Sequence, residues 1–252
     1  MIEIDSVSHA IGGSTILDDV TLTIPRGGVT ALIGPNGAGK STLLSLIARL
    51  EKVQTGRIRV NGLDVARTPT AHLARHLAIQ RQDTVIATRL TVRQLVGFGR
   101  YPHHKGRAGK ADHVKADEAI SALHLDAFAN RFLDTLSGGQ RQRALIAMSV
   151  AQETDYLLLD EPLNNLDMAH ARSLMELLRG LADRSGRTIV VVLHEVNYAA
   201  AHADHVVAMK AGGIVAQGSR GDVLTARMIG DIFDTPVSVM PHGDHLIIHH
   251  FG

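Results

Sequence analysis

Three short apolar runs constrain the fold of this chain more than any other feature. They are VTALI at Val29–Ile33, YLLL at Tyr156–Leu159 and IVVVL at Ile189–Leu193. None of them alternates apolar and charged residues, and such runs are typical of parallel strands covered on both faces by helices. The sequence therefore predicts an α/β fold with a buried, largely parallel sheet.

The spacing of apolar residues changes between residues 84 and 150, where helical patterns follow one another without a convincing strand. The expected helices cover Thr91–Gly99, Ala111–Leu123 and Gly139–Ala151. We expect one domain over residues 1–252, with a helical subdomain at 84–150 inserted into a catalytic core of residues 1–83 and 151–235. Residues 236–252 predict a terminal hairpin that turns at His242-Gly243-Asp244.

The bulk composition excludes several classes of function. Lys and Arg total 26 against 25 acidic residues, so the net charge of +1 gives no strong attraction to nucleic acid, and none is expected as a partner. The absence of cysteine excludes disulfides, thiolate zinc sites and a cysteine nucleophile. No signal peptide is visible, and the most apolar run, Thr188–Leu193, is far below the roughly 20 residues of a spanning helix. A membrane role would need a partner.

A glycine-rich segment follows the first predicted strand and opens a helix. It comprises Gly34, Pro35, Asn36, Gly37, Ala38, Gly39, Lys40, Ser41 and Thr42. In this setting the backbone N–H groups converge on a phosphate, the lysine reaches the β and γ oxygens, and the Ser41 hydroxyl is offered to Mg²⁺. The segment predicts an ATPase phosphate-binding loop.

Two carboxylates, Asp160 and Glu161, directly follow the buried run Leu157-Leu158-Leu159. Ligands of α/β proteins bind at the carboxyl ends of the strands. We expect Asp160 to hold Mg²⁺ through water and Glu161 to act as the general base toward the attacking water.

A second anion-binding helix N-terminus occurs in LSGGQ, Leu136–Gln140. Letter for letter, this segment resembles the signature loop of the ABC ATPase family, and the motifs between Ile2 and Phe233 follow the family's order. The resemblance implies a P-loop NTPase (RecA-like) core with a mixed sheet and a head-to-tail dimer of two copies. In that dimer the loop caps ATP on the opposite subunit through Ser137, Gly138, Gly139 and Gln140.

Further family positions are matched residue by residue. Gln82 resembles the glutamine that senses Mg²⁺ and the attacking water, although Gln80 offers a competing register. His194 resembles the switch histidine that contacts the γ-phosphate, and Asp167 resembles the aspartate of the dimer-interface loop. The family usually stacks an aromatic ring on adenine near position 11, whereas this chain has Ile11, which lacks a π-face.

The resemblance also implies a polytopic membrane permease that docks near Thr88–Tyr101, where Leu90, Leu95, Phe98 and Tyr101 are candidate contacts. The segments LTVRQLVGFGRYPHHKGR and DEPLNNLDMAHA are similar to those of ATPases of bacterial iron-siderophore importers, a group that includes haem and vitamin B12 systems. This similarity implies a place on the cytoplasmic face of the membrane and, indirectly, an extracytoplasmic substrate-binding protein.

Two alternatives accompany these expectations. One is an ABC ATPase without a permease, such as a partner in iron-sulfur cluster assembly. The other concerns the histidines near the C-terminus, which we interpret as solvated surface residues; His245 and His249 would share one face of a strand and could form a weak metal site.

Overall fold

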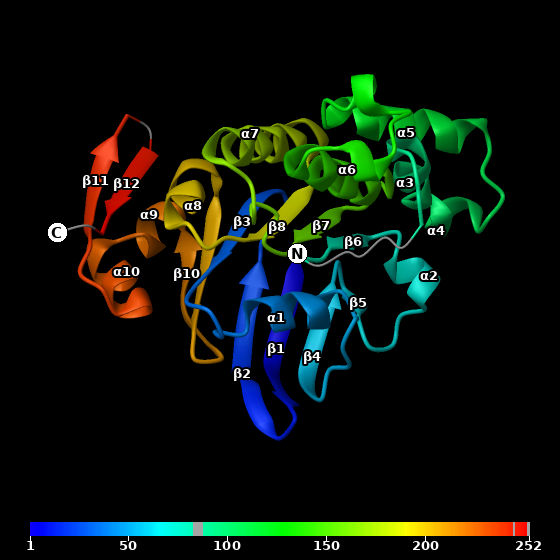
Figure 1. Ribbon diagram of the computed structural model, residues 1–252. Coiled ribbons are helices and arrows are strands. Elements are labelled where there is room, and N and C mark those ends of the chain that lie inside the picture. The colour runs from blue at the N-terminus through cyan, green and yellow to red at the C-terminus, as the bar shows by residue number, and fades with distance from the viewer. Residues whose placement is uncertain (83–87, 244, 251–252) are drawn as a thin grey trace. The chain divides into compact units, whose positions relative to one another are not determined.

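The computed structural model describes residues 1–82, 88–243 and 245–250. The chain forms two compact units, coloured by residue number in Figure 1. Unit 1 comprises Met1–Thr68 and Thr188–Gly252, and unit 2 comprises Pro69–Arg187. No helix in the described part of the chain is long and apolar enough to cross a membrane.

One sheet of unit 1 is antiparallel and has the strand order β2-β1-β4-β5. Its strands are β1 (Ile2–Ile11), β2 (Ser14–Ile24), β4 (Thr55–Val60) and β5 (Leu63–Asp64). Along β2, Val20, Leu22 and Ile24 are buried while Thr21 and Thr23 are exposed. This alternation shows that only one face of the strand is covered by the core.

The second group of strands in unit 1 carries two of the three apolar runs. Its members are β3 (Gly28–Ile33), β8 (Thr188–Val192), β9 (His205–Lys210) and β10 (Gly213–Ser219). β3 pairs in parallel with both β8 and β9, and β10 pairs antiparallel with β9. Every residue of β8 is buried, as the unbroken apolar run predicted. The strands confirm the predicted mixed, largely parallel arrangement.

Helices and a hairpin complete unit 1. The helices are α1 (Lys40–Ile47), α8 (Val196–His202), α9 (Arg220–Val223) and α10 (Ala226–Phe233). β11 (Ser238–His242) and β12 (His245–His249) pair antiparallel, with His242 opposite His245, in the segment where a hairpin was expected. Asp244, predicted in its turn, lies outside the described residues.

Unit 2 contains the third apolar run as strand β7 (Tyr156–Leu159), which pairs in parallel with β6 (Leu77–Gln80). Its helices are α2 (Thr70–Leu73), α3 (Val92–Phe98), α4 (Tyr101–His104), α5 (Lys110–Ala122), α6 (Gly138–Ala151) and α7 (Met168–Ser185). α3, α5 and α6 pack on one another and match the three predicted helices to within a residue at each end. The single-turn helices α2 and α4 were missed, because one turn shows no periodicity.

The predicted division of the chain at residues 84 and 150 stays a proposal. Unit 2 is larger than the predicted helical subdomain, because it also contains β6, β7 and α7. Residues 84–87 of the predicted subdomain lie outside the described residues.

Candidate active site

The glycine-rich segment lies between β3 and α1, as the sequence predicted. Gly39 is the N-cap of α1 and adopts a left-handed conformation with φ 95°. Since glycine has no side chain, it leaves the first N–H groups of the helix to a ligand, and the helix dipole favours an anion there. Lys40 is buried, and its Nζ donates to the carbonyl oxygens of Gly34 (2.8 Å) and Pro35 (2.9 Å). The Lys40 side chain therefore bonds to the backbone of the loop that precedes it.

Backbone packing requires glycine at both ends of this loop. A Cβ on Gly34, which has φ 144°, would lie 2.1 Å from the carbonyl oxygen of Met209 in β9. A Cβ on Gly39 would lie 2.6 Å from Leu17 and 3.0 Å from the carbonyl oxygen of Ile16. Both distances are shorter than van der Waals contact, so the loop conformation depends on these two glycines.

His194 lies at the same edge of unit 1 as the glycine-rich loop. It follows β8, and the N–H of Leu193 donates to the carbonyl oxygen of Leu32 in β3 at 3.1 Å. Because β3 and β8 are parallel, their carboxyl ends bring His194 and the loop after Ile33 to one edge. The imidazole is exposed. Ile11, at the end of β1, is 53% exposed and offers an apolar surface without an aromatic face.

The carboxylates Asp160 and Glu161 lie at the carboxyl edge of the strand pair in unit 2. The N–H of Asp160 donates to the carbonyl oxygen of Gln80 at 3.0 Å, and the Asp160 side chain is buried. Glu161 has a φ of 49°, which is rare for a residue with a side chain, and Asn164 Nδ2 donates to its Oε2. Such backbone strain, of about 1–3 kcal/mol, concentrates at functional sites.

The two glutamines proposed for the same role differ in their surroundings. Gln80, the last residue of β6, is buried, and its Oε1 accepts from Gln142 Nε2 at 3.4 Å. Gln82 is exposed and lies two residues beyond the strand. Of the two, Gln82 is the one whose amide is exposed to solvent, and the choice between them stays a prediction. Its neighbour Asp83 lies outside the described residues.

The signature segment forms the N-terminus of α6. Ser137 is the N-cap: its Oγ accepts from the Gln140 N–H at 3.3 Å, and Gln140 Oε1 accepts from the Ser137 N–H at 3.1 Å. This reciprocal pair is a capping box. Ser137 and Gly138 are exposed, whereas Gly139 is buried.

Asp167 caps α7 beside the signature helix. Its Oδ1 accepts from the His170 N–H at 2.8 Å and lies 2.7 Å from His170 Nδ1. The backbone hydrogen bond from His170, followed by the bond from the His170 ring, lowers the pKa of the Asp167 carboxyl. A Cβ on Gly139 would lie 3.1 Å from the same ring, so His170 contacts both segments.

The stretch proposed for permease docking exposes two of its four apolar candidates. Phe98 and Tyr101 are 57% and 59% exposed, whereas Leu90 is half-buried. Leu95 is buried and packs inside unit 2, so its assignment to the docking surface was wrong. It faces inward because α3 turns its buried stripe, Val92, Leu95 and Val96, toward the other helices.

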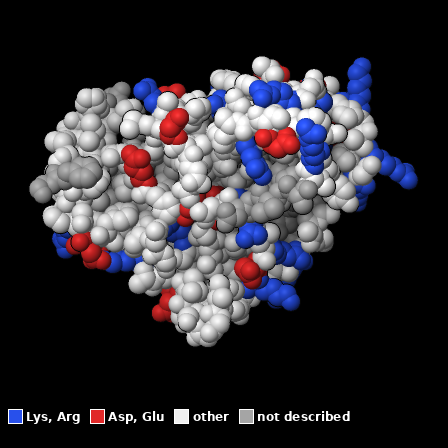
Figure 2. Space-filling model, in the orientation of Figure 1, with Lys and Arg blue, Asp and Glu red and all other residues white. Residues whose placement is uncertain are grey.

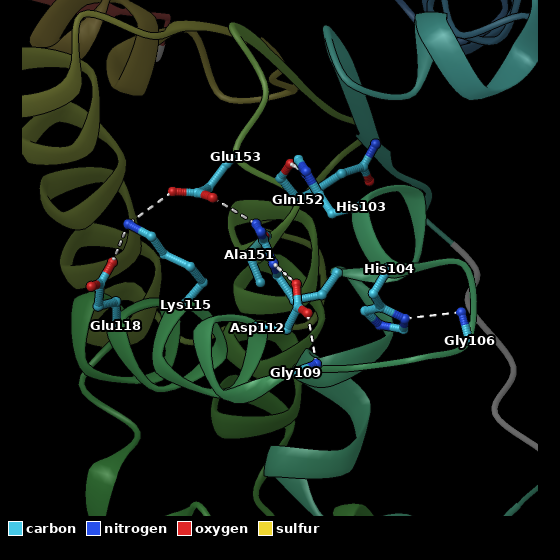
Figure 3. Close-up of polar contacts among 11 residues, drawn as sticks. His103, His104, Gly106, Gly109, Asp112, Lys115, Glu118, Ala151, Gln152 and Glu153 are labelled. Atoms are coloured by element: carbon cyan, nitrogen blue, oxygen red, sulfur yellow. Dashed lines mark hydrogen bonds and ion pairs between the residues drawn. The ribbon is translucent and has the colours of Figure 1, made fainter.

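Arg100, between Phe98 and Tyr101 in the sequence, is buried. Arg100 Nη1 donates to the carbonyl oxygen of Ala151 and to Glu153 Oε2, both at 2.7 Å, and its Nε donates to Asp112 at 3.3 Å. Figure 3 shows these partners, with Lys115 joining Glu153 to a second carboxylate. Burial alone would raise the pKa of Glu153, but the hydrogen bonds from Lys115 and Arg100 outweigh it and lower the pKa. The network ties the start of α4 to α5 and to the end of α6.

Most side chains on the face shown in Figure 2 are uncharged, and Lys and Arg are more frequent than Asp and Glu on the right of this view. Among the described residues no group of three His, Asp or Glu side chains could hold a metal ion.

Comparison with known proteins decides the family. The family model "ABC transporter" matches residues 17–164. The petrobactin import ATP-binding protein FatE of Bacillus anthracis is 48% identical over 245 residues, which cover 96% of this chain and 98% of that protein. This chain belongs to the ABC transporter family. It is an ATP-hydrolysing cassette, and the resemblance read from LSGGQ is confirmed.

Two solved structures of ABC proteins match the fold. A putative metal-chelate type ABC transporter in an inward-facing conformation has a TM-score of 0.85 at 25% identity and covers 99% of this chain and 96% of that chain. A dimeric ATP-binding cassette in a post-hydrolysis state, bound to ADP and Pi, has a TM-score of 0.76 at 27% identity and covers 87% and 98%. They confirm the P-loop NTPase fold class.

Sequence reasoning missed three polar residues that organise the site regions. They are Asn164, which donates a hydrogen bond to Glu161, the buried Arg100, and Asn197, whose side-chain amide bonds to β12. The arginine stands in a helical pattern without any sign that it is buried. Asn197 is separated from its partner by 51 residues, so no local pattern could reveal the contact.

Proposed function

We propose that this ABC ATPase powers import of iron-siderophore complexes through a membrane permease. The single observation that carries the proposal is the 48% identity, over 96% of the chain, to a petrobactin import ATP-binding protein. The exposed Phe98 and Tyr101 supply a surface on which a permease helix can dock near Thr88–Tyr101. The protein then works at the cytoplasmic face of the membrane, downstream of an extracytoplasmic binding protein.

ATP binds on the segment Gly34–Thr42 in this proposal. The N–H groups at the start of α1 hold the phosphates, and Lys40 Nζ exchanges its bonds to loop carbonyls for phosphate oxygens. Ile11 packs against the adenine by apolar contact only. Since stacking on an aromatic ring is worth about 1–3 kcal/mol per base, we expect weaker selection for adenine here.

The donor atoms proposed for Mg²⁺ suit that ion. Ser41 supplies a hydroxyl, Asp160 a carboxylate and Gln82 an amide oxygen, and Mg²⁺ prefers oxygen ligands. When bound, the ion neutralises charge on the β- and γ-phosphates. The position of Asp160 at the carboxyl end of β7 supports this role, because ligands of α/β proteins bind at that edge.

Hydrolysis depends on three side chains. Glu161 takes a proton from the attacking water, and the bond from Asn164 to Glu161 Oε2 holds the carboxylate in place. His194 donates to the γ-phosphate, and Gln82 aligns the water. Both of these side chains are exposed.

Two copies act together. Ser137, Gly138, Gly139 and Gln140 of one subunit cap the γ-phosphate held by the other, and Asp167 lies at the interface. The dimeric state of a related cassette bound to ADP and Pi supports this arrangement. Closure of the dimer moves the permease, and hydrolysis reopens it.

Substitution of the general base tests the proposal. Glu161→Gln keeps the size of the side chain but removes the base, so hydrolysis should fall about 10²- to 10³-fold while ATP binding persists. The ATP-loaded variant should accumulate as a dimer in analytical ultracentrifugation. In cells that lack the native gene, it should also fail to restore uptake of radiolabelled ferric siderophore.

The matched control is Glu176→Gln, which changes an exposed glutamate paired with Arg172 on α7. It should hydrolyse ATP and restore uptake like the unaltered protein. A Glu161→Gln protein that stays monomeric at saturating Mg-ATP contradicts the dimer. Normal ferric-siderophore uptake in cells that carry no copy of this gene contradicts the cargo.

A further inference from the structure

The C-terminal hairpin contacts the helix that follows His194. Asn197 lies three residues after His194, in the first turn of α8. Its Nδ2 donates to the carbonyl oxygen of Ile248 at 3.1 Å, and its Oδ1 accepts from the N–H of the same residue at 2.8 Å. One side-chain amide therefore satisfies both backbone groups of one hairpin residue.

The geometry follows from the strand pairing of the hairpin. β12 pairs with β11 along one edge, and Ile248 lies opposite Val239. In an antiparallel pair, alternate residues point their N–H and C=O groups away from the partner strand. Those of Ile248 point toward α8, and the Asn197 amide takes the place of a neighbouring strand. Figure 1 shows the hairpin beside α8.

A cavity of about 420 Å³ lies beside this contact. It is lined by His194, Glu195 and Asn197, by Ile229 and Phe233 of α10, and by Ile248 of the hairpin. The contact between Asn197 and Ile248 therefore lies at the same pocket as His194.

We propose that Asn197 is a positioning residue for His194 and that the hairpin thereby sets the rate of ATP hydrolysis. The inference rests on the proposed function of His194. The two hydrogen bonds fix the first turn of α8 to β12, and this turn continues directly from the exposed segment His194-Glu195. Without the amide, the backbone between His194 and Asn197 can adopt more than one position. Small displacements of a reacting group are costly.

The test compares Asn197→Ala with the unaltered chain. We expect kcat for ATP to fall about tenfold with KM for ATP unchanged, because the nucleotide is held elsewhere, on Gly34–Thr42. Hydrogen exchange at the Ile248 amide should accelerate, which reports that the bond is lost. The control is Ile247→Ala, on the neighbouring hairpin residue that is 40% exposed; it should leave kcat unchanged.

A double-mutant comparison separates positioning from general destabilisation. In a His194→Ala background, Asn197→Ala should lower kcat no further, since it acts through the imidazole. A further fall in that background, or an unchanged kcat in the single variant, overturns the inference while leaving the proposed function intact. If His194→Ala itself hydrolyses ATP normally, the proposed role of His194 fails and the inference falls with it.

If Asn197→Ala lowers the melting temperature enough to confuse the kinetics, Asn197→Asp provides the second measurement. Aspartate keeps the acceptor for the Ile248 N–H but loses the donor to the Ile248 carbonyl. The carboxylate also places an oxygen against the Ile248 carbonyl oxygen, so the kcat of this variant should fall at least as far as that of the alanine variant. A kcat equal to that of the unaltered chain would show that the donor half of the contact does not position His194.

Discussion

The molecule contains two helix N-termini proposed to hold phosphate, and they are built in opposite ways. The N-terminus of α1 is preceded by Gly39, which has no capping side chain, and the flanking backbone admits only glycine at positions 34 and 39. The N-terminus of α6 is capped by its own Ser137 and Gln140. No described atom would obstruct a Cβ at Gly138, and its φ is not in the left-handed region.

The difference separates two reasons for a glycine. At α1 the fold itself requires the glycines, because Met209 and Ile16 approach the loop. At Gly138 the fold makes no such demand, and glycine in a helix costs about 0.5–1 kcal/mol relative to alanine. In the proposed dimer, glycine at this position would allow close approach of the other subunit's nucleotide.

The largest effect is expected for Gly34→Ala. A Cβ 2.1 Å from the Met209 carbonyl oxygen forces backbone movement, and overpacking together with an unfavourable φ should cost about 3 kcal/mol of unfolding free energy. Urea denaturation measures it. Gly37→Ala, where φ is 79° and no described atom lies within 4 Å, is the control and should lose only about 1 kcal/mol. Equal losses of unfolding free energy in the two variants would show that the close approach of Met209 does not require glycine at position 34.

A smaller loss is expected for Ser137→Ala. This change removes the cap of α6, and the loss of a Ser cap costs about 1 kcal/mol. Ser137→Thr keeps the hydroxyl and should restore most of the stability in thermal unfolding. If alanine is as stable as threonine, the capping box does not stabilise α6.

Gly138→Ala should change the free energy of unfolding least among these variants. It should raise this free energy, whereas the other substitutions lower it. Alanine at an unstrained position stabilises by about 0.4–1 kcal/mol. ATP-dependent dimerisation of the variant should nevertheless be lost when measured by sedimentation in a Glu161→Gln background. Dimers as abundant as in Glu161→Gln alone would show that nothing approaches Gly138 closely.

The N-cap of α7 sharpens the comparison through pH. The hydrogen bonds from His170 lower the pKa of Asp167 below its ordinary value of 3.8. The folded state therefore binds fewer protons than the unfolded state, so this stabilisation is present above the ordinary pKa and is lost as pH falls below it. Asp167→Asn keeps a capping oxygen but does not titrate.

In thermal unfolding followed from neutral to acidic pH, the Asn variant should lose less stability than the parent below the ordinary pKa. Identical pH profiles would show that the charge of Asp167 makes no contribution to the cap. Ser137, an uncharged cap, should show no such dependence.

Much of the fold and the site could be predicted because the signals are local. The runs Val29–Ile33, Tyr156–Leu159 and Ile189–Leu193 indicated buried strands, and LSGGQ indicated both a capped helix and the family. Each of these depends on residues within a few positions of one another.

Contacts between distant residues needed the tertiary structure. Leu95 and Phe98 stand on one short helix, and only packing decided that the first is buried while the second is exposed. The burial of Arg100 among Asp112, Ala151 and Glu153, and the bond from Asn197 to Ile248, join segments about 12 to 53 residues apart. The sequence by itself determined the phosphate-binding chemistry, since glycine, lysine and helix start act locally. Only the fold decided which polar groups hold that chemistry in place, because burial and long-range pairing depend on how the whole chain packs.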